Sequence, residues 1–239
     1  MSGSVGEVLI AVAVPLAIAI GAGVVASFRP VGERLRSAIQ HFAGGLIFAA
    51  IAVELLPEIH GAEPVPVALG AAAGVALMLA IRALAERSER NPEANGTDSG
   101  RRLIATIGVD LLIDGLLLGI AFSIGSDQGV LLTLGLTFEV LALALVVSGK
   151  LHEAGVSRLK AALTPAALVL LLALGAVLGV SALGGLSGPA FAAVVGFGSV
   201  ALLYLVVEEL LTEAHETPDT PLITASFFGG FLLLLLLGG

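Results

Sequence analysis

The chain contains eight long apolar runs, and these constrain its fold more than any other feature. Each is close to the roughly 20 residues that a helix needs to cross the hydrocarbon core of a bilayer. Backbone groups in lipid must be hydrogen-bonded within the protein, so separate runs of this length predict helices. The predicted spans are 5–27, 39–57, 64–85, 103–124, 129–148, 162–183, 189–211 and 221–237.

Composition agrees with a membrane protein. The chain is 57% hydrophobic and 13% charged, whereas a soluble domain is about 25% charged. We therefore predict an all-α protein with one transmembrane domain over residues 1–239, surrounded by lipid. A net charge of −8 argues against a nucleic-acid partner, and the lack of cysteine excludes thiolate metal sites. No nucleophile motif suggests an enzyme, and no cofactor is expected.

The basic residues predict the orientation of the chain. All 11 lie near one set of connections, ten of them between spans 1 and 2, 3 and 4, or 5 and 6, and Arg82 in the last turn of span 3. With eight spans these loops share one side, which the positive-inside rule makes cytoplasmic. Both termini are then external, and the protein is a multi-pass protein of the cell membrane. The loop 86–102 is polar and is predicted to be flexible.

Two acidic segments end similar spans. Glu54-Leu55-Leu56-Pro57-Glu58-Ile59-His60 ends span 2, and Glu209-Leu210-Leu211-Thr212-Glu213-Ala214-His215 ends span 7. With eight spans, these ends lie on opposite membrane faces. That arrangement predicts an inverted repeat of three helices, spans 1–3 and 6–8, around a central pair of spans 4 and 5.

Three acids lie near the centres of spans 4 and 5. Asp110 and Asp114 are four residues apart, which places them on one face of a helix. Glu139 lies at a matching depth on the next, antiparallel helix. A carboxylate at the bilayer centre costs about 2.5–3.5 kcal/mol on insertion scales, and these spans hold no basic partner. The acids are therefore protonated, line water or surround a cation, and a divalent ion held by the three carboxylates is the simplest way to offset their charge.

These residues resemble the ZIP (Zrt/Irt-like protein) family of divalent metal transporters. That family carries His-Asn-x-Pro-Glu-Gly in its fourth helix. The run from Asp110 to Gly119 keeps this frame, with Asp110 in place of the His and Asp114 in place of the Glu. The block that begins at Glu139 is similar to the acidic end of the fifth helix. Spans 2 and 7 are also similar to their counterparts, and the family's eight helices and external termini match the spans above.

The resemblance implies a divalent metal ion as substrate, held at the bilayer midplane by Asp110, Asp114 and Glu139. The chain departs from the family at the neighbouring ligand positions, which here are Leu111 and Gly135, and span 6 carries no acid. A second, adjacent metal position is therefore expected to be lost. Three oxygen ligands shift the expected preference from zinc towards manganese, iron(II) or magnesium. The resemblance and the small-residue faces also suggest a homodimer.

Further candidates for the ion pathway or a secondary metal position lie at the ends of spans 2 and 7: Glu54, Glu208, Glu209, His215 and Glu216. Solvated helix ends explain them equally well. Glycine pairs such as Gly115/Gly119 and Gly175/Gly179 predict close helix packing.

The sequence thus predicts a divalent cation transporter of the zinc, iron and manganese class that works by alternating access. Two alternatives remain open. The same acids would serve a proton or monovalent cation channel or carrier. A fixed site would instead suit a membrane protein that senses metal without transporting it.

Overall fold

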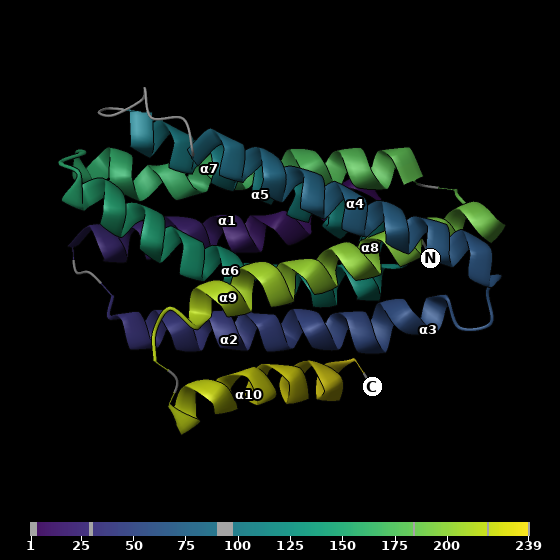
Figure 1. Ribbon diagram of the computed structural model, residues 1–239. Coiled ribbons are helices and arrows are strands. Elements are labelled where there is room, and N and C mark those ends of the chain that lie inside the picture. Colours follow the sequence, from purple (N-terminus) through teal and green to yellow (C-terminus); the bar gives the residue numbers. More distant parts are fainter. Residues whose placement is uncertain (1–3, 29–30, 90–97, 184, 219, 239) are drawn as a thin grey trace.

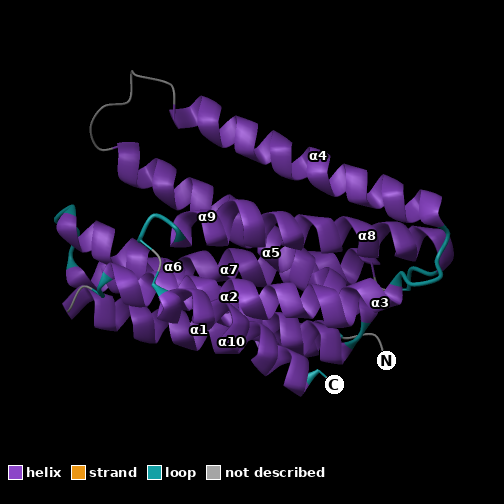
Figure 2. Cartoon of the chain, turned by 60° about the horizontal axis from the view of Figure 1, so that its bottom comes forward, coloured by secondary structure: helices purple, strands orange, loops and turns teal. Residues whose placement is uncertain are grey.

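The protein is a bundle of helices (Figure 1). The structure is a computed structural model that describes residues 4–28, 31–89, 98–183, 185–218 and 220–238. Over these residues it contains no strand (Figure 2), which confirms the all-α prediction. Seven helical segments are long and apolar enough to cross a membrane, consistent with a multi-pass membrane protein, and α10 is a shorter apolar helix.

The helices follow one another with short connections. They are α1 (Val5–Phe28), α2 (Glu33–Ala50), α3 (Leu56–Glu58), α4 (Pro64–Glu89), α5 (Asp98–Ile124), α6 (Ser126–Glu153), α7 (Arg158–Leu183), α8 (Gly188–Tyr204), α9 (Leu211–Ala214) and α10 (Pro221–Leu237). Two π-helical segments, η1 (Ile51–Leu55) and η2 (Leu205–Leu210), join α2 to α3 and α8 to α9. The start of α1 and the end of α10 lie at the same end of the bundle (Figure 1).

Most helices extend beyond the predicted spans, because helical hydrogen bonding continues past the apolar segment. The predicted loop 86–102 is corrected at both ends. Residues 86–89 continue α4, and residues 98–102 begin α5. Positions 90–97, on which the prediction of flexibility mainly falls, lie outside the described residues.

The helices divide into two groups by their contacts. Helices α1, α5, α6 and α7 pack on one another, and we call them the first body. The second body contains α2–η1–α3, α4, α8–η2–α9 and α10, in which α2 packs on α10 and α4 packs on α8. The main contacts between the bodies are α2 with α6 and α5 with α8.

Small residues bring the helices together, as their spacing predicts. A Cβ on Gly115 would lie 2.1 Å from the Leu172 carbonyl oxygen, and a Cβ on Gly175 would lie 2.1 Å from that of Leu112. Only glycine permits backbones to approach this closely. The α5–α7 contact therefore fixes the rotation of α5, and with it the direction of the acids on its other faces.

Candidate metal centre

Asp110, Asp114 and Glu139 meet at the contact between α5 and α6. One carboxylate oxygen from each lies within 4.8 Å of the others. Asp114 is 1% exposed and Glu139 is 5% exposed, whereas Asp110 is partly exposed. The structure therefore brings together the three acids that helical spacing and matching depth had suggested.

The buried oxygens of this cluster have no hydrogen-bond partner. Both carboxylate oxygens of Asp114 and Oε2 of Glu139 are enclosed and unpaired. A buried polar group left unpaired costs about 1–3 kcal/mol, and a charged one costs more. The arrangement is thus poorly stabilised by the protein alone, and a bound cation would compensate all three oxygens.

The separation of the oxygens limits which ions fit. Magnesium binds oxygen at about 2.0–2.1 Å, so two of its ligand oxygens are at most about 4.2 Å apart. Calcium-like distances of about 2.4 Å allow about 4.8 Å. The three oxygens lie within 4.8 Å of one another, which is near the upper limit for the larger ion, so a smaller ion requires a more compact arrangement.

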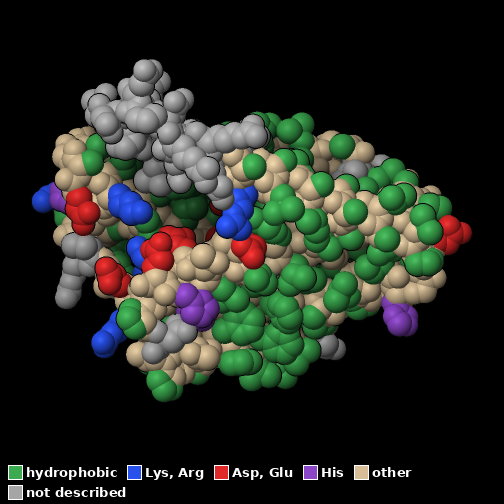
Figure 3. Space-filling view, in the orientation of Figure 1, with side chains coloured by type: hydrophobic (Ala, Val, Ile, Leu, Met, Phe, Trp, Pro, Cys, Tyr) green, Lys and Arg blue, Asp and Glu red, His purple; other side chains and the backbone are tan. Residues whose placement is uncertain are grey.

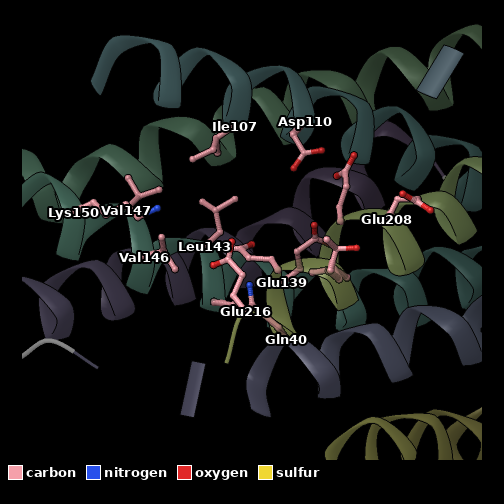
Figure 4. Close-up of a pocket in the computed structure, with 15 residues that line it drawn as sticks. Gln40, Ile107, Asp110, Glu139, Leu143, Val146, Val147, Lys150, Glu208 and Glu216 are labelled. Carbon is pink, nitrogen blue, oxygen red and sulfur yellow. The ribbon is translucent and has the colours of Figure 1, made fainter. Parts of the chain in front are cut away.

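A cavity of about 360 Å³ leads to the cluster from one end of the bundle. Asp110 and Glu139 face into it, and its wall continues along α6 through Leu143 and Val146 to Lys150 (Figure 4). Acids from η2 and the following segment line the other side, including Glu209 and Glu216. Charged side chains gather around a hollow at this end of the bundle (Figure 3).

The secondary candidates separate into two locations. Glu209 lies in the cavity wall, within hydrogen-bonding reach of Asp110. Glu208 also lines the cavity and forms a 2.7 Å ion pair with Arg82. Glu216 lies near the cavity mouth, 3.7 Å from an Arg36 nitrogen.

His215 and Glu54 do not line the cavity. His215 is exposed and packs edge-on against His41, with ring centroids 5.0 Å apart. Glu54 lies at the opposite end of the bundle, where it accepts a 3.0 Å hydrogen bond from Gln128. The sequence places Glu54 near the end of span 2 but does not identify Gln128 as its partner.

Sequence reasoning missed two residues of the cavity wall. Gln40 lines the cavity and is 2% exposed, and Lys150 brings a positive charge to the mouth. Lys150 was detectable, because it follows Glu139 by 11 residues, which is three helical turns along the same face. Gln40 was not, because only the packing of α2 against α6 brings it to the cavity.

The departures at Gly135 and in α7 have a structural counterpart. A Cβ on Gly135 would lie 2.6 Å from Ile47 Cγ1, so this position packs α6 against α2 and has no room for a ligand side chain. In α7, Gly175 and Gly179 pack against the α5 backbone. Gly135, Gly175 and Gly179 therefore all serve contacts between helices.

No known family model matches the chain, and no curated protein matches it.

Proposed function

We propose that the chain is a ZIP-like carrier that moves a divalent metal cation across the cell membrane by alternating access. The observation that carries this proposal is the cluster of three carboxylate oxygens within 4.8 Å of one another, whose enclosed oxygens lack hydrogen-bond partners. A divalent cation would offset two of the three negative charges of such a cluster directly. The cavity that reaches it from one end gives the ion a route.

All eight helical segments would span the bilayer in this proposal, with α10 as the eighth. The basic residues between the spans would then face the cytoplasm together with the cavity mouth, and both termini would be external. The acids Glu209, Glu213 and Glu216 line the cavity. A concentration of negative charge there would attract a cation leaving the midplane.

An inverted repeat is part of this proposal and would support alternating access. In such a repeat, α1, α2 and α4 (spans 1–3) are equivalent to α7, α8 and α10 (spans 6–8), and α5 is equivalent to α6. The α2–α10 contact is then equivalent to the α8–α4 contact, and the α5–α7 contact to the α6–α1 contact. All four contacts occur. Phe42 and Phe197 are equivalent in this exchange, and the carbonyl oxygen of each is approached by a glycine, Gly230 and Gly74 respectively. Both π-helical segments also end just beyond an equivalent acid, Glu54 and Glu209.

The chemistry of the ligands favours a hard cation. Carboxylate oxygens suit manganese, iron(II) or magnesium, whereas zinc favours imidazole and thiolate. We therefore propose manganese, iron(II) or magnesium as the substrate, with zinc bound less well. A homodimer in the membrane remains part of the proposal.

Metal flux into liposomes tests the function. Wild type, Glu139→Gln and Glu153→Gln are reconstituted, and Mn²⁺ entry is followed with an enclosed metal-sensitive dye. Glu153 is an exposed acid on the same helix, so it is the matched control. We expect flux in wild type and in Glu153→Gln, and its loss in Glu139→Gln.

Two results would contradict the carrier. Metal binding without entry in wild type would indicate a sensor with a fixed site. Flux of protons or monovalent cations would indicate the channel or carrier alternative, if Mn²⁺ is not itself transported and does not inhibit that flux.

A further inference from the structure

Gln128 and Glu54 connect the two bodies by a hydrogen bond. Gln128 lies in the first turn of α6, and its Nε2 donates to Glu54 Oε2 in η1 at 3.0 Å. Glu54 is 9% exposed, and a Cβ on Gly238 would lie 2.8 Å from its other oxygen. By contrast, Ser27 Oγ to the Arg158 carbonyl and Ser148 Oγ to the Ala161 carbonyl are hydrogen bonds within the first body.

This hydrogen bond lies at the end of the pathway opposite the cavity. Gln128 and Lys150 are at the two ends of α6, about 33 Å apart at 1.5 Å per residue, with Glu139 midway. The cavity reaches Glu139 from the Lys150 side. On the Gln128 side, Leu132 and Leu136 are at most 1% exposed. Within the described part of the chain, the site is therefore open through the cavity on one side, whereas buried leucines of α6 close it on the other.

Glu54 and Glu209 are equivalent in the inverted repeat, and their surroundings are complementary. Glu209 lines the cavity and reaches Asp110 on α5. Glu54 is enclosed and held by Gln128 on α6. Helices α5 and α6 are the pair that the repeat exchanges. An opening of the opposite side would therefore release Glu54 from Gln128, and would turn it towards the site as Glu209 is turned here.

We propose that the Glu54–Gln128 hydrogen bond is a latch that closes the pathway on the side opposite the cavity, and that its release exposes Glu54 as the first carboxylate an incoming cation meets. The proposal rests on the carrier described above. A hydrogen bond to a charged group that forms in only one of two conformational states changes the ratio of the populations of those states by about tenfold to a hundredfold.

Thiol labelling tests the latch, because the chain has no cysteine of its own. Leu132→Cys probes the closed side, since residue 132 is one turn from Gln128 on the face that leads to Glu139. Val146→Cys probes the cavity wall. Each probe is combined with Gln128→Leu, and its rate of reaction with a water-soluble thiol reagent is measured in liposomes.

Ser126→Ala is the matched control. Ser126 is in the same turn of α6, and its hydroxyl donates to Glu7 of α1, within the first body, at 2.6 Å. We expect Gln128→Leu to speed labelling at residue 132 by at least tenfold and to slow it at residue 146, while Ser126→Ala changes neither rate. Gln128→Asn, which shortens the side chain, should act in the same direction if the leucine variant does not fold.

Equal labelling rates in Gln128→Leu and Ser126→Ala at both probes would overturn the latch. Faster labelling at both probes together would also overturn it, because a latch moves the two sides in opposite directions. Failure of the carrier itself is recognised separately, by the absence of Mn²⁺ flux in wild type. If wild type transports and the probes do not respond, only the latch is wrong.

Discussion

Replacing Asp114 by asparagine is expected to stabilise the protein without metal and to abolish its stabilisation by metal. Asp114 is the most deeply buried acid of the cluster, and neither of its oxygens has a hydrogen-bond partner. Asparagine keeps the size of the side chain and removes the charge. The two effects have the same origin, because the charge that destabilises the empty site is the charge that binds the cation.

The magnitude follows from the spacing of the oxygens. Two unit charges at the upper limit of 4.8 Å repel by about 3.5 kcal/mol at an effective dielectric constant of 20. Asp114 has two acidic neighbours, Asp110 and Glu139. If one of them is protonated, Asp114 is repelled by the charge of the other alone. Removing the charge of Asp114 should therefore stabilise the protein without metal by about 3 kcal/mol. For a chain of this length that corresponds to a rise of about 6–12 °C in Tm. A cation at a hundred times its Kd stabilises wild type by about 2.7 kcal/mol.

Thermal unfolding in detergent, with and without Mn²⁺, measures both effects. Asp127→Asn is the control, because it is the same chemical change at an exposed acid. We expect Asp114→Asn to unfold above wild type without metal and to gain nothing from Mn²⁺, while Asp127→Asn follows wild type. The reasoning is refuted if Asp114→Asn unfolds below wild type and still gains the wild-type increment from metal.

Three further substitutions address packing, ion choice and access. Gly115→Ala should destabilise the protein by about 1–3 kcal/mol in thermal unfolding, because the new Cβ would meet the Leu172 carbonyl. Gly149→Ala should not destabilise it, because a Cβ there would have nothing within 4 Å. Equal effects of the two substitutions would contradict the close α5–α7 contact. Asp110→His adds an imidazole, so Zn²⁺ should compete better against Mn²⁺ in a stabilisation assay, and an unchanged ratio would argue against Asp110 as a ligand. Lys150→Gln removes a positive charge from the cavity mouth and should raise Mn²⁺ flux severalfold at low salt. The increase should become smaller at high salt, because salt screens the charge. An increase in flux that does not depend on salt would exclude an electrostatic cause.

Much of the fold follows from the sequence because its causes are local. An apolar run of about 20 residues must satisfy its own backbone in lipid, so each run specifies a helix. A spacing of four residues likewise places Asp110 and Asp114 on one face, whatever surrounds them. Glycine spacing indicated that Gly115 and Gly175 would carry close contacts, although not that these two would face each other.

The tertiary structure alone decided which polar residues outside the cluster of three acids meet. Helical periodicity fixes the face that residues share, but not the neighbour that this face contacts, since that depends on how α5, α6 and α2 pack. Packing brings Gln40 of α2 to the cavity with Glu139 of α6. It also holds Glu54 against Gln128 at the far end, 74 positions away in sequence, and leaves Glu209 beside Asp110. The local sequence thus determines which helix face carries the acids. Contacts between helices distant in the chain determine which side of the site is open and which is closed.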